Sequence, residues 1–440
     1  MYFLYRTLSA LAMSVIAPYY AWRSWRNGEP TRSLGERFGF LSPETLARAS
    51  ASPGAIWIHA VSVGEVLAAQ PLVAHIKRNF GGRAVFVSTT TETGRRLARE
   101  RLRCADAVFY FPLDWLVTVR RTLRAIRPVL VIIMETEIWP NFLREARRQA
   151  IPVAFVNARI SERSFARFRR WKFLVGEFYE RVLRDAVGFL AQTPADAARL
   201  TEMGAPEETV EVIGNLKYDS EPPSIGLFGS WLSQQIQNQE RWPVLIAGSV
   251  VAEEEQAVMA AYDIVQRQWR HTLLVLAPRK PDRFDAAVQI ASTAGWNAVR
   301  RSGVNLQAAL DENADVLVLD SIGELAGLYA LGDAVFVGGS LVPSGGHNIL
   351  EPAWFSKPPV FGPHMENFQA MSQQFLSAKA AIQVMSGQQL GKVWVQLIED
   401  KRIGERMGKA ARALCERNRG ATGRALERIA RWLPVTERPA

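Results

Sequence analysis

The feature that most constrains the fold is a repeated alternation of short apolar runs with amphipathic stretches. In the first half of the chain the apolar runs are AIWIHA, AVFVST, AVFYF, VLVIIME, VAFVNA and VGFLAQ. Such runs are typical of strands buried on both faces of a parallel sheet, and the stretches between them, such as VLAAQPLVAHIKRNF, have helical periodicity. A second set follows, with VLIAGS, TLLVLAP, VLVLDS, AVFVGGS and PPVFGP. The sequence therefore predicts an α/β protein with two doubly wound, Rossmann-like domains.

The length agrees with two domains, because 440 residues exceed what one core usually serves. Prolines and a polar Gln/Asn run between the two sets predict an interdomain linker at 220–243. The N-terminal domain is then expected at 23–219 and the C-terminal domain at 244–415. Residues 416–440 are amphipathic and predict a C-terminal helix that is available to pack back on the N-terminal domain.

The first 22 residues predict a membrane anchor, at 1–22. The segment MYFLYRTLSALAMSVIAPYYAW carries only one charge, Arg6, and ends in aromatic residues that several arginines follow. This pattern is typical of a membrane segment whose basic side stays in the cytoplasm. Because the apolar run barely reaches the roughly 17 residues of the shortest spanning helices, it either spans the membrane or lies in the interface. An ordinary buried N-terminal helix is the alternative.

Charge and cysteine content limit which classes of partner and cofactor are expected. A net charge of +10 and a pI near 9.8 favour nucleic acid, acidic lipid head groups or phosphorylated small molecules. The only cysteines, Cys104 and Cys415, are too far apart in sequence to suggest a disulfide framework or a cysteine-based metal site. No His/Asp cluster has metal-binding spacing, and the chain lacks a P-loop and an early GxGxxG motif. A mechanism without metal or cofactor is expected.

Residues just after the predicted strands are the candidate ligands, since open α/β sheets bind ligands at the carboxyl ends of their strands. In the first half, Ser62 and Gly64 lie at a helix start that either binds an anion or uses Ser62 as a cap. Glu135 and Glu137 follow VLVII and project to one side, where they are either functional or paired with arginines. Arg159 follows VAFVNA.

The segment after Arg159, ARISERSFARFRRWK, is basic with interleaved aromatics. It suits phosphate groups or a membrane surface, with a solvated helix face as the alternative. Lys217 in GNLKYD is expected near the cleft between the halves. Glu36, between two glycines, is by sequence alone an unremarkable exposed glutamate on a loop.

In the second half, Arg279 and Lys280 directly follow a predicted strand. The stretch GGSLVPSGGHN contains two glycine pairs, which predict a close approach to the backbone. We interpret it as a loop and helix start whose N–H groups a nucleotide and its phosphate can approach. His347 is expected to position rather than to act as a base.

Together these segments resemble the 3-deoxy-D-manno-octulosonic acid (Kdo) transferases, which glycosylate lipid A precursors. The resemblance is carried, in the family's order, by GERFGF, HAVSVGE, METEIWPN, NARIS, GNLKYD, PRKPDRF, IGEL, VFVGGSLVPSGGHNILEPA and FGPHMENF. It implies a GT-B glycosyltransferase, with an N-terminal acceptor domain and a C-terminal CMP-Kdo domain facing a central cleft. It also implies an enzyme held at the cytoplasmic face of the inner membrane.

The resemblance also implies residue roles. Glu36 corresponds to the family's proton acceptor, and Glu137 and Lys217 to residues that aid the transition state. The implied donor-binding residues are Pro278, Arg279, Ile322, Gly323, Glu324, Asn348, Ile349, Leu350 and Glu351. The candidates for binding the acceptor or a phosphate are Ser62, Gly64, Glu135 and Arg159. The chain departs from the family pattern at AGSVVAEEE and at Lys280 of PRKPDRF.

The expected activity is inverting transfer of Kdo from CMP-Kdo to a hydroxyl of the lipid A precursor (lipid IVA) in lipopolysaccharide core biosynthesis. The expected partners are CMP-Kdo, this precursor and the inner-membrane surface, without nucleic acid. One alternative is a GT-B enzyme that uses a UDP-sugar on another lipid acceptor; the other is a non-enzymatic, basic nucleic-acid-binding protein. The same motifs would serve the addition of one, two or more Kdo residues.

Overall fold

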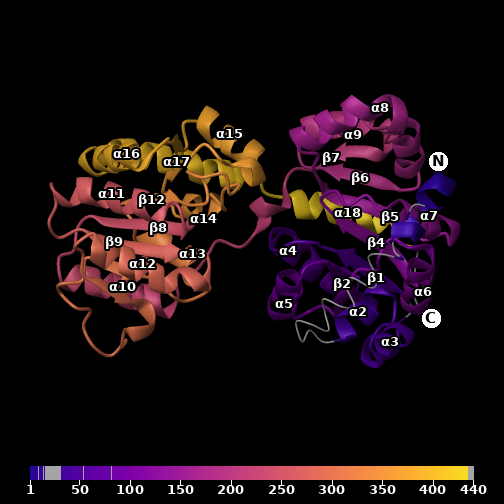
Figure 1. Cartoon of the computed structure of the whole chain (residues 1–440), viewed down its shortest axis with the longest axis horizontal. Helices are drawn as coiled ribbons and strands as arrows, with labels where there is room; N and C mark the ends of the chain where they lie inside the picture. Colours follow the sequence, from indigo (N-terminus) through magenta and orange to yellow (C-terminus); the bar gives the residue numbers. More distant parts are fainter. Residues whose placement is uncertain (8, 13, 15–30, 53, 81, 435–440) are drawn as a thin grey trace. The chain divides into compact units, whose positions relative to one another are not determined.

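The computed structural model describes residues 1–7, 9–12, 14, 31–52, 54–80 and 82–434. The chain forms two compact units (Figure 1). Unit 1 comprises Met1–Ser220 and Asn418–Ala440, and unit 2 comprises Glu221–Arg417.

Unit 1 contains a parallel sheet in the order β3-β2-β1-β4-β5-β6-β7. Its strands are β1 (Ala55–His59), β2 (Ala84–Thr89), β3 (Ala107–Tyr110), β4 (Pro128–Met134), β5 (Val153–Ala158), β6 (Gly188–Ala191) and β7 (Val210–Val212). Its helices are α2 (Thr31–Arg37), α3 (Pro43–Ser50), α4 (Val63–Asn79), α5 (Glu92–Arg101), α6 (Leu116–Ile126), α7 (Pro140–Arg148), α8 (Glu162–Leu183), α9 (Pro194–Glu202) and α18 (Ala421–Trp432), with the short η1 (Glu207–Thr209) and η2 (Leu216–Asp219). The strand order reverses between β1 and β4, which is where ligands of such sheets bind.

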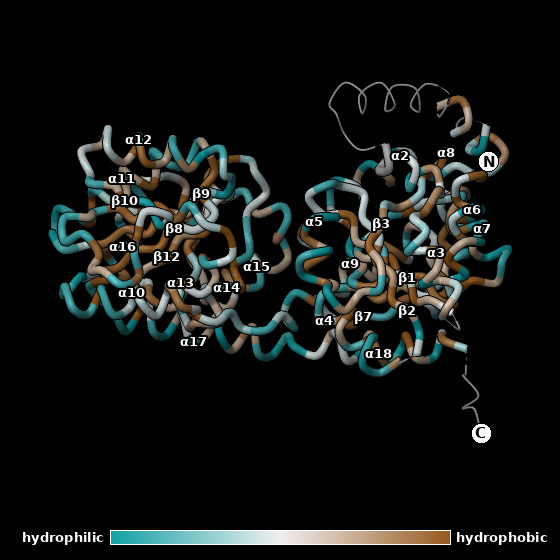
Figure 2. Tube along the Cα trace, turned by 90° about the horizontal axis from the view of Figure 1, so that it is seen from below, coloured by the Kyte–Doolittle hydropathy of each residue, from teal (hydrophilic) through white to brown (hydrophobic). Residues whose placement is uncertain are grey.

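The buried strands explain why the apolar runs lack a polar alternation. Successive residues of β1 point to opposite faces, so Trp57 joins the core beneath α6, α7 and α8, whereas Ile56 and Ile58 join the core beneath α4, α5 and α18. Figure 2 shows the same arrangement, with hydrophobic residues concentrated on the inner strands of each unit and hydrophilic residues on the outer helical turns.

Unit 2 contains a second parallel sheet, in the order β10-β11-β9-β8-β12-β13-β14. Its strands are β8 (Val244–Val250), β9 (Leu273–Pro278), β10 (Ala298–Arg300), β11 (Val316–Val318), β12 (Ala334–Val337), β13 (Pro359–Phe361) and β14 (Ile382–Gln383). Its helices are α10 (Gly226–Asn238), α11 (Glu255–Gln266), α12 (Phe284–Thr293), α13 (Leu325–Leu328), α14 (Leu350–Trp354), α15 (Gln369–Ser377), α16 (Gly387–Glu399) and α17 (Lys401–Arg417), with the short η3 (Pro281–Arg283), η4 (Arg301–Gly303), η5 (Tyr329–Leu331) and η6 (Glu366–Phe368). Here the order reverses between β8 and β12.

The predicted linker at 220–243 and the C-terminal segment each contain a helix that packs on one of the units. Most of 220–243, predicted as a linker, forms helix α10 of unit 2, because Phe228, Trp231 and Leu232 are buried there. The C-terminal helix α18 packs against α4 of unit 1. Its start is held by Asp219, which accepts hydrogen bonds from the N–H groups of Gly420 (2.6 Å) and Thr422.

The N-terminal segment is described only in part, since 8, 13 and 15–30 lie outside the described residues and the predicted anchor at 1–22 runs into them. Residues 2–7 are helical, and the hydroxyls of Tyr2 and Tyr5 donate to Asp185 (2.9 Å) and Asp114 (2.8 Å). Among the helices in the described ranges, none has the length and apolar character that crossing a membrane requires.

Candidate functional site

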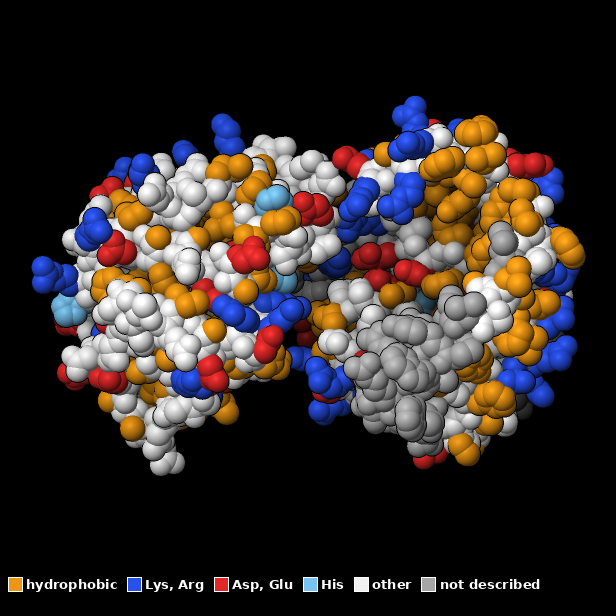
Figure 3. Space-filling model, viewed as in Figure 1, with side chains coloured by type: hydrophobic (Ala, Val, Ile, Leu, Met, Phe, Trp, Pro, Cys, Tyr) orange, Lys and Arg blue, Asp and Glu red, His pale blue; other side chains and the backbone are white. Residues whose placement is uncertain are grey.

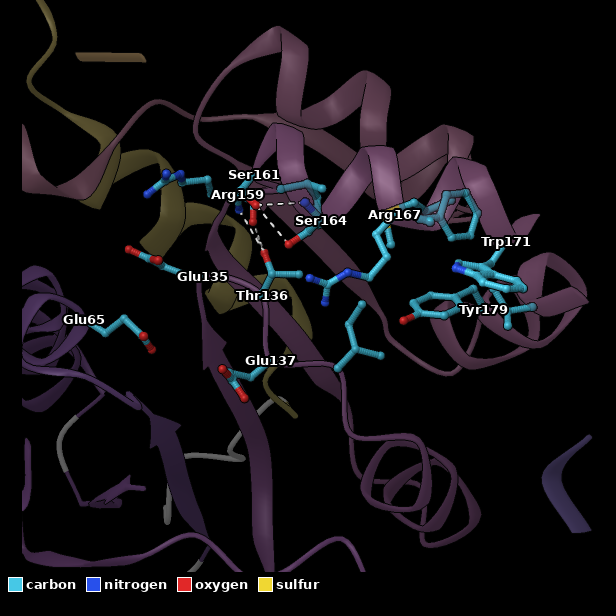
Figure 4. Close-up of a pocket in the computed structure, with 15 residues that line it drawn as sticks. Glu65, Glu135, Thr136, Glu137, Arg159, Ser161, Ser164, Arg167, Trp171 and Tyr179 are labelled. Carbon is cyan, nitrogen blue, oxygen red and sulfur yellow. Dashed lines mark hydrogen bonds between the residues drawn. The ribbon is translucent and has the colours of Figure 1, made fainter. Parts of the chain in front are cut away.

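The carboxyl ends of β1, β4 and β5 open into a pocket of about 620 Å³. We call it the unit 1 pocket. It is lined by Glu65, Glu135, Thr136, Glu137, Ile138, Arg159, Ile160, Ser161, Ser164, Arg167, Phe168, Trp171, Val175, Tyr179 and Met203. In Figure 4 the three glutamates lie on one side, Trp171 and Tyr179 on the other, and Arg167 between them. The pocket therefore joins an acidic end to an aromatic end.

The acidic end holds three carboxylates close enough to influence one another. Burial raises the pKa of Glu65 to about 8, and the charge of Glu135 adds to this rise. Burial and Glu135 also raise the pKa of Glu137, which makes no hydrogen bond or ion pair with the described residues. Glu135 adopts a positive φ of 52° directly after β4, an uncommon conformation for a non-glycine residue that is often found at functional sites.

Lys217 supplies a positive charge at this end, with its Nζ 3.5 Å from Glu135 Oε1. Its position depends on Asn157 at the end of β5, whose Oδ1 accepts a hydrogen bond from the N–H of Leu216 at 3.0 Å. The predicted segments NARIS and GNLKYD are thus joined, and METEIWPN lies beside them. Four of the sequence candidates, Glu135, Glu137, Arg159 and Lys217, are brought together at the ends of neighbouring strands.

Ser62 serves as the cap of α4, which was one of the two roles that its position in the sequence predicted. Its hydroxyl accepts from the N–H of Glu65 (3.4 Å), and Glu65 in turn accepts from the N–H of Val61 (2.8 Å). This reciprocal pair is a capping box, and Glu65 was missed in the sequence although the Ser-x-x-Glu spacing signals it. Gly64, in the first turn, has only the Ser62 hydroxyl near the position a Cβ would take.

The aromatic end is supplied by α8, which contains the basic segment noted in the sequence. Phe168 is buried, whereas Trp171 is 47% exposed and Phe173 is 82% exposed. Figure 3 shows hydrophobic side chains and Lys/Arg side chains gathered over α8, next to acidic side chains in a hollow of unit 1. This helix is therefore not simply a solvated polar face.

The position of Glu36 differs from the exposed loop position that the sequence alone suggested. It lies in α2 rather than on a loop, and it is 3% exposed rather than solvent-facing. Its carboxylate accepts from Arg95 (2.8 Å) and from the backbone N–H of Tyr110 (3.0 Å). The long-range partner Arg95, 59 residues away, gave no signal in the sequence. Glu36 does not line the unit 1 pocket.

Unit 2 has a pocket of about 410 Å³ at the carboxyl ends of β8, β9 and β12, which we call the unit 2 pocket. It is lined by Val250, Val251, Ala252, Glu253, Arg279, Lys280, Asp282, Arg283, Val342, Pro343 and Ser344. The side chains of Arg279 and Lys280 are exposed and make no hydrogen bond or ion pair with other described residues. Two such cations beside a strand end suit an anionic ligand.

Arg279 also acts on the residues at the start of α14. Burial lowers the pKa of His347 to about 4, with a further contribution from Arg279, and burial raises the pKa of Glu351 to about 7. Asn348 donates to Glu351 (3.2 Å) and accepts from the N–H of Leu350 (3.2 Å). Arg279, Asn348 and Glu351 therefore belong to one polar group.

The remaining donor candidates are more dispersed. Ile349 and Leu350 are buried in the core, so they expose almost no surface to a ligand. Ile322, beside Gly323, is 81% exposed. Glu324 accepts two hydrogen bonds of 3.0 Å from the guanidinium of Arg301. Pro278 ends β9.

The interpretation of the glycine stretch is corrected in part. The N–H groups of Gly339, Ser340 and Leu341 are already bound by the carboxylate of Glu254, so they are not available to a phosphate. A Cβ on Gly345 or Gly346 would collide with Asn367 or Met365. The close approach that these glycines permit is therefore made by the protein itself.

Within the described ranges, no group of three or more His, Cys, Asp or Glu side chains is placed to hold a metal ion. The metal-free mechanism stays a prediction.

Solved structures identify the class of fold. A glycosyltransferase from Rickettsia africae has a TM-score of 0.57 at 12% identity, covering 87% of this chain and 100% of that one. A UDP-GlcNAc 2-epimerase from Neisseria meningitidis, solved with UDP-GlcNAc, has a TM-score of 0.55 at 14% identity, covering 86% and 99%. The chain therefore shares the two-domain α/β fold of these structures.

Sequence relatives identify the family. A family model described as 3-deoxy-D-manno-octulosonic-acid transferase matches residues 32–220. The 3-deoxy-D-manno-octulosonic acid transferase of Haemophilus influenzae is 31% identical over 98% of both chains, and that of Bordetella pertussis is 32% identical over 97% of this chain and 99% of its own. The chain belongs to the Kdo transferase family and is an enzyme of that family.

Proposed function

We propose that this enzyme transfers Kdo from CMP-Kdo to a hydroxyl of a lipid A precursor, lipid IVA, with inversion at the anomeric carbon, in lipopolysaccharide core biosynthesis. Unit 1 would bind the acceptor and unit 2 the donor. The observation that carries the proposal is the unit 1 pocket, in which carboxylates, arginines and aromatic side chains meet at a switch point.

The acceptor half of the proposal follows from the chemistry of this pocket. A phosphorylated, acylated sugar presents hydroxyls, phosphates and hydrocarbon. Arg159 and Arg167 suit the phosphates, the aromatic end suits the hydrocarbon, and the carboxylates suit hydroxyl groups. The apolar wall of α8 suits any lipid acceptor, so the donor, rather than this pocket, separates the proposal from an enzyme that uses a UDP-sugar on another lipid acceptor.

The donor half rests on unit 2. CMP-Kdo carries a phosphate and a carboxylate, and Arg279 and Lys280 offer two cations that no other described residue pairs. Glu351, held by Asn348, can accept hydrogen bonds from a ribose. We assign these residues to the donor, together with the backbone at Ile322–Glu324.

In the proposed step, the acceptor oxygen attacks the anomeric carbon of Kdo and a new C–O bond forms. The bond from that carbon to the CMP phosphate oxygen breaks, and CMP leaves with the electron pair. We assign the hydroxyl proton to Glu36, as the family resemblance implies; its fixed position through Arg95 and Tyr110 supports a defined role. Lys217 and Glu137 would stabilise charge that develops during transfer.

We also propose that the enzyme works at the cytoplasmic face of the inner membrane. Exposed Trp171, Phe173 and Leu174 on α8 stand among arginines, a combination that suits an anionic lipid surface. The acceptor is itself a membrane lipid, so a lipid-facing α8 would place the pocket where the acceptor resides.

Two measurements test the function. Purified enzyme given CMP-Kdo and lipid IVA should form Kdo-lipid IVA and release CMP, and mass spectrometry of the lipid also counts the Kdo residues added. In parallel, CMP should raise the melting temperature more than UDP or a polynucleotide does, because only a bound ligand stabilises the native state. A preference for a UDP-sugar or for polynucleotide would support the corresponding rival and reject the proposal. Activity that persists in EDTA would support the metal-free prediction.

A further inference from the structure

Two neighbouring glutamates at the start of α11 are buried without lying in either pocket. Glu254 and Glu255 are both 0% exposed, although they sit in the acidic run AEEE, which would be expected to face solvent. Buried carboxylates are costly unless hydrogen bonds or cations satisfy them. Hydrogen bonds satisfy the carboxylates of both residues, but the donors differ.

Glu254 binds backbone N–H groups from two loops. Its Oε1 accepts from Ser340 and Leu341, both at 2.7 Å, and its Oε2 accepts from Gly339 at 2.6 Å and from Val251 at 3.1 Å. Several N–H groups converging on one anion form a nest of the kind that elsewhere holds a phosphate. Here the anion is part of the chain.

The glycine pair after β12 is explained by this carboxylate. Gly339 has a φ of +66°, and a Cβ on Gly338 would lie 2.9 Å from Glu254 Oε2 and 2.8 Å from the Cα of Val250. Only glycine lets the loop close around the glutamate. Ser340 extends the connection to β13, because its hydroxyl accepts from the N–H of Gly362 at 2.8 Å.

Glu255 binds the third loop. Arg283, in the PRKPDRF segment, donates to both of its carboxylate oxygens through Nε (3.2 Å) and Nη2. Such a two-bond pair fixes the guanidinium in direction as well as distance. The Arg279–Arg283 segment is thereby held against α11.

The three loops held in this way are the walls of the unit 2 pocket. Val250–Glu253, Arg279–Arg283 and Val342–Ser344 line it, and each belongs to or directly continues a segment that Glu254 or Glu255 binds. We propose that Glu254 and Glu255 are positioning residues that hold these loops in the geometry that binds the donor, with Glu254 filling the nest so that the donor phosphate is bound by Arg279 and Lys280 instead. This inference rests on the proposed donor role of unit 2.

The main test is Glu254→Gln. The amide keeps the size of the side chain, but its NH₂ group would face N–H donors that need an acceptor, so the loops should lose their fixed arrangement. We expect the donor KM and the Kd for CMP to rise by roughly tenfold or more, with the acceptor KM unchanged. Glu405→Gln, an exposed glutamate of α17 outside both pockets, is the matched control and should leave all three constants unchanged.

The separation of the two KM values distinguishes positioning from simple instability. A variant that is only less stable loses active enzyme and hence apparent kcat, whereas the folded fraction keeps its donor KM. An unchanged donor KM and CMP Kd in folded Glu254→Gln would overturn the proposal. If wild type bound UDP and not CMP, the proposed donor would be wrong, and the same measurements with UDP would still test the positioning role.

Glu255 gives an independent arm should Glu254→Gln fail to fold. Glu255→Gln and Arg283→Gln should each raise the CMP Kd by a few-fold, and the double variant should be no worse than the more damaging single variant, because both remove the same ion pair. Fully multiplicative losses, or no loss in either single variant, would contradict the role assigned to Glu255.

Discussion

The two units place carboxylates near the switch points of similarly ordered sheets but use them in opposite ways. In unit 1, Glu65, Glu135 and Glu137 face a pocket, and two of them have raised pKa values. In unit 2, Glu254 and Glu255 at the start of α11 are buried and hydrogen-bonded, and neither lines the pocket, in which Arg279 and Lys280 are exposed. The same doubly wound architecture therefore groups three carboxylates at one end of the pocket in unit 1, and exposes two cations that no other described residue pairs, Arg279 and Lys280, in the pocket of unit 2.

The difference follows from the number of hydrogen-bond donors near each carboxylate. Glu254 lies at a helix start and a glycine loop that together provide four backbone N–H groups, which donate to both of its carboxylate oxygens. Glu137 has no partner among the described residues, so burial and the neighbouring Glu135 favour its protonated form. The hydrogen bonds of Glu254 hold loops together, whereas Glu137, without such bonds to the described residues, remains available to bind a hydroxyl group of a ligand.

The largest expected effect tests which carboxylate of unit 1 accepts the proton. Glu36→Gln should lower kcat by roughly 10² to 10⁴ with little change in the CMP Kd, because a base contributes mainly in the transition state. Turnover with CMP-Kdo and lipid IVA measures this, and melting temperatures exclude unfolding from the lost Arg95 pair. Glu65→Gln and Glu137→Gln serve as comparisons. A near-active Glu36→Gln beside an inactive Glu137→Gln would move the base into the unit 1 pocket.

The next effect tests the basic character of unit 2. Arg279→Ala should weaken CMP binding by roughly 1.5 to 3 kcal/mol, the scale of a charge-assisted hydrogen bond, which calorimetry would detect as a rise in Kd. Arg406→Ala, an exposed arginine of α17, is the matched control. Equal affinity in both variants would show that the donor phosphate lies elsewhere.

The pH dependence of stability tests the environment of Glu65, a buried carboxylate of the unit 1 pocket. The pKa of Glu65 is raised from 4.5 to about 8, so the native state favours the protonated form. That stabilisation is complete below about pH 4.5 and is lost as the pH rises towards about 8. The amide in Glu65→Gln stays neutral at every pH and can keep the capping box. The melting temperature of wild type should therefore fall by a few degrees relative to that of Glu65→Gln between these pH values.

The control for this experiment is Glu399→Gln, an exposed glutamate in unit 2, whose difference from wild type should not vary in this way. A constant difference between wild type and Glu65→Gln across the same range would mean that Glu65 is ionised in the native protein throughout.

The smallest expected effect concerns the surface of α8. Phe173→Ala should reduce binding to vesicles that contain phosphatidylglycerol by a few-fold, because one aromatic contact is lost while the arginines remain. Leu227→Ala in α10 of unit 2 is a matched control, since Leu227 is 86% exposed and Phe173 is 82% exposed. Equal losses in a flotation assay would mean that the membrane contact is not specific to unit 1.

Much of the fold was predictable because it rests on local signals. The apolar runs became the strands of two parallel sheets, and motifs at strand ends marked both pockets. Glu36 and Glu254 escaped this reasoning for one reason: each is defined by partners distant in the chain. Glu36 meets Arg95 and Tyr110, and Glu254 meets Gly339 and its neighbours.

The sequence by itself determined the two α/β units, the strands that form them and the segments from which both pockets are built, since periodicity and glycine placement act over a few residues. The tertiary structure alone decided how each charged side chain is used. Whether a glutamate is a structural anchor, as Glu254 is, or part of a pocket, as Glu137 is, depends on which N–H groups and cations the packed strands and helices bring within about 3 Å of it. Those neighbours come from segments far apart in the chain, so no local pattern encodes them.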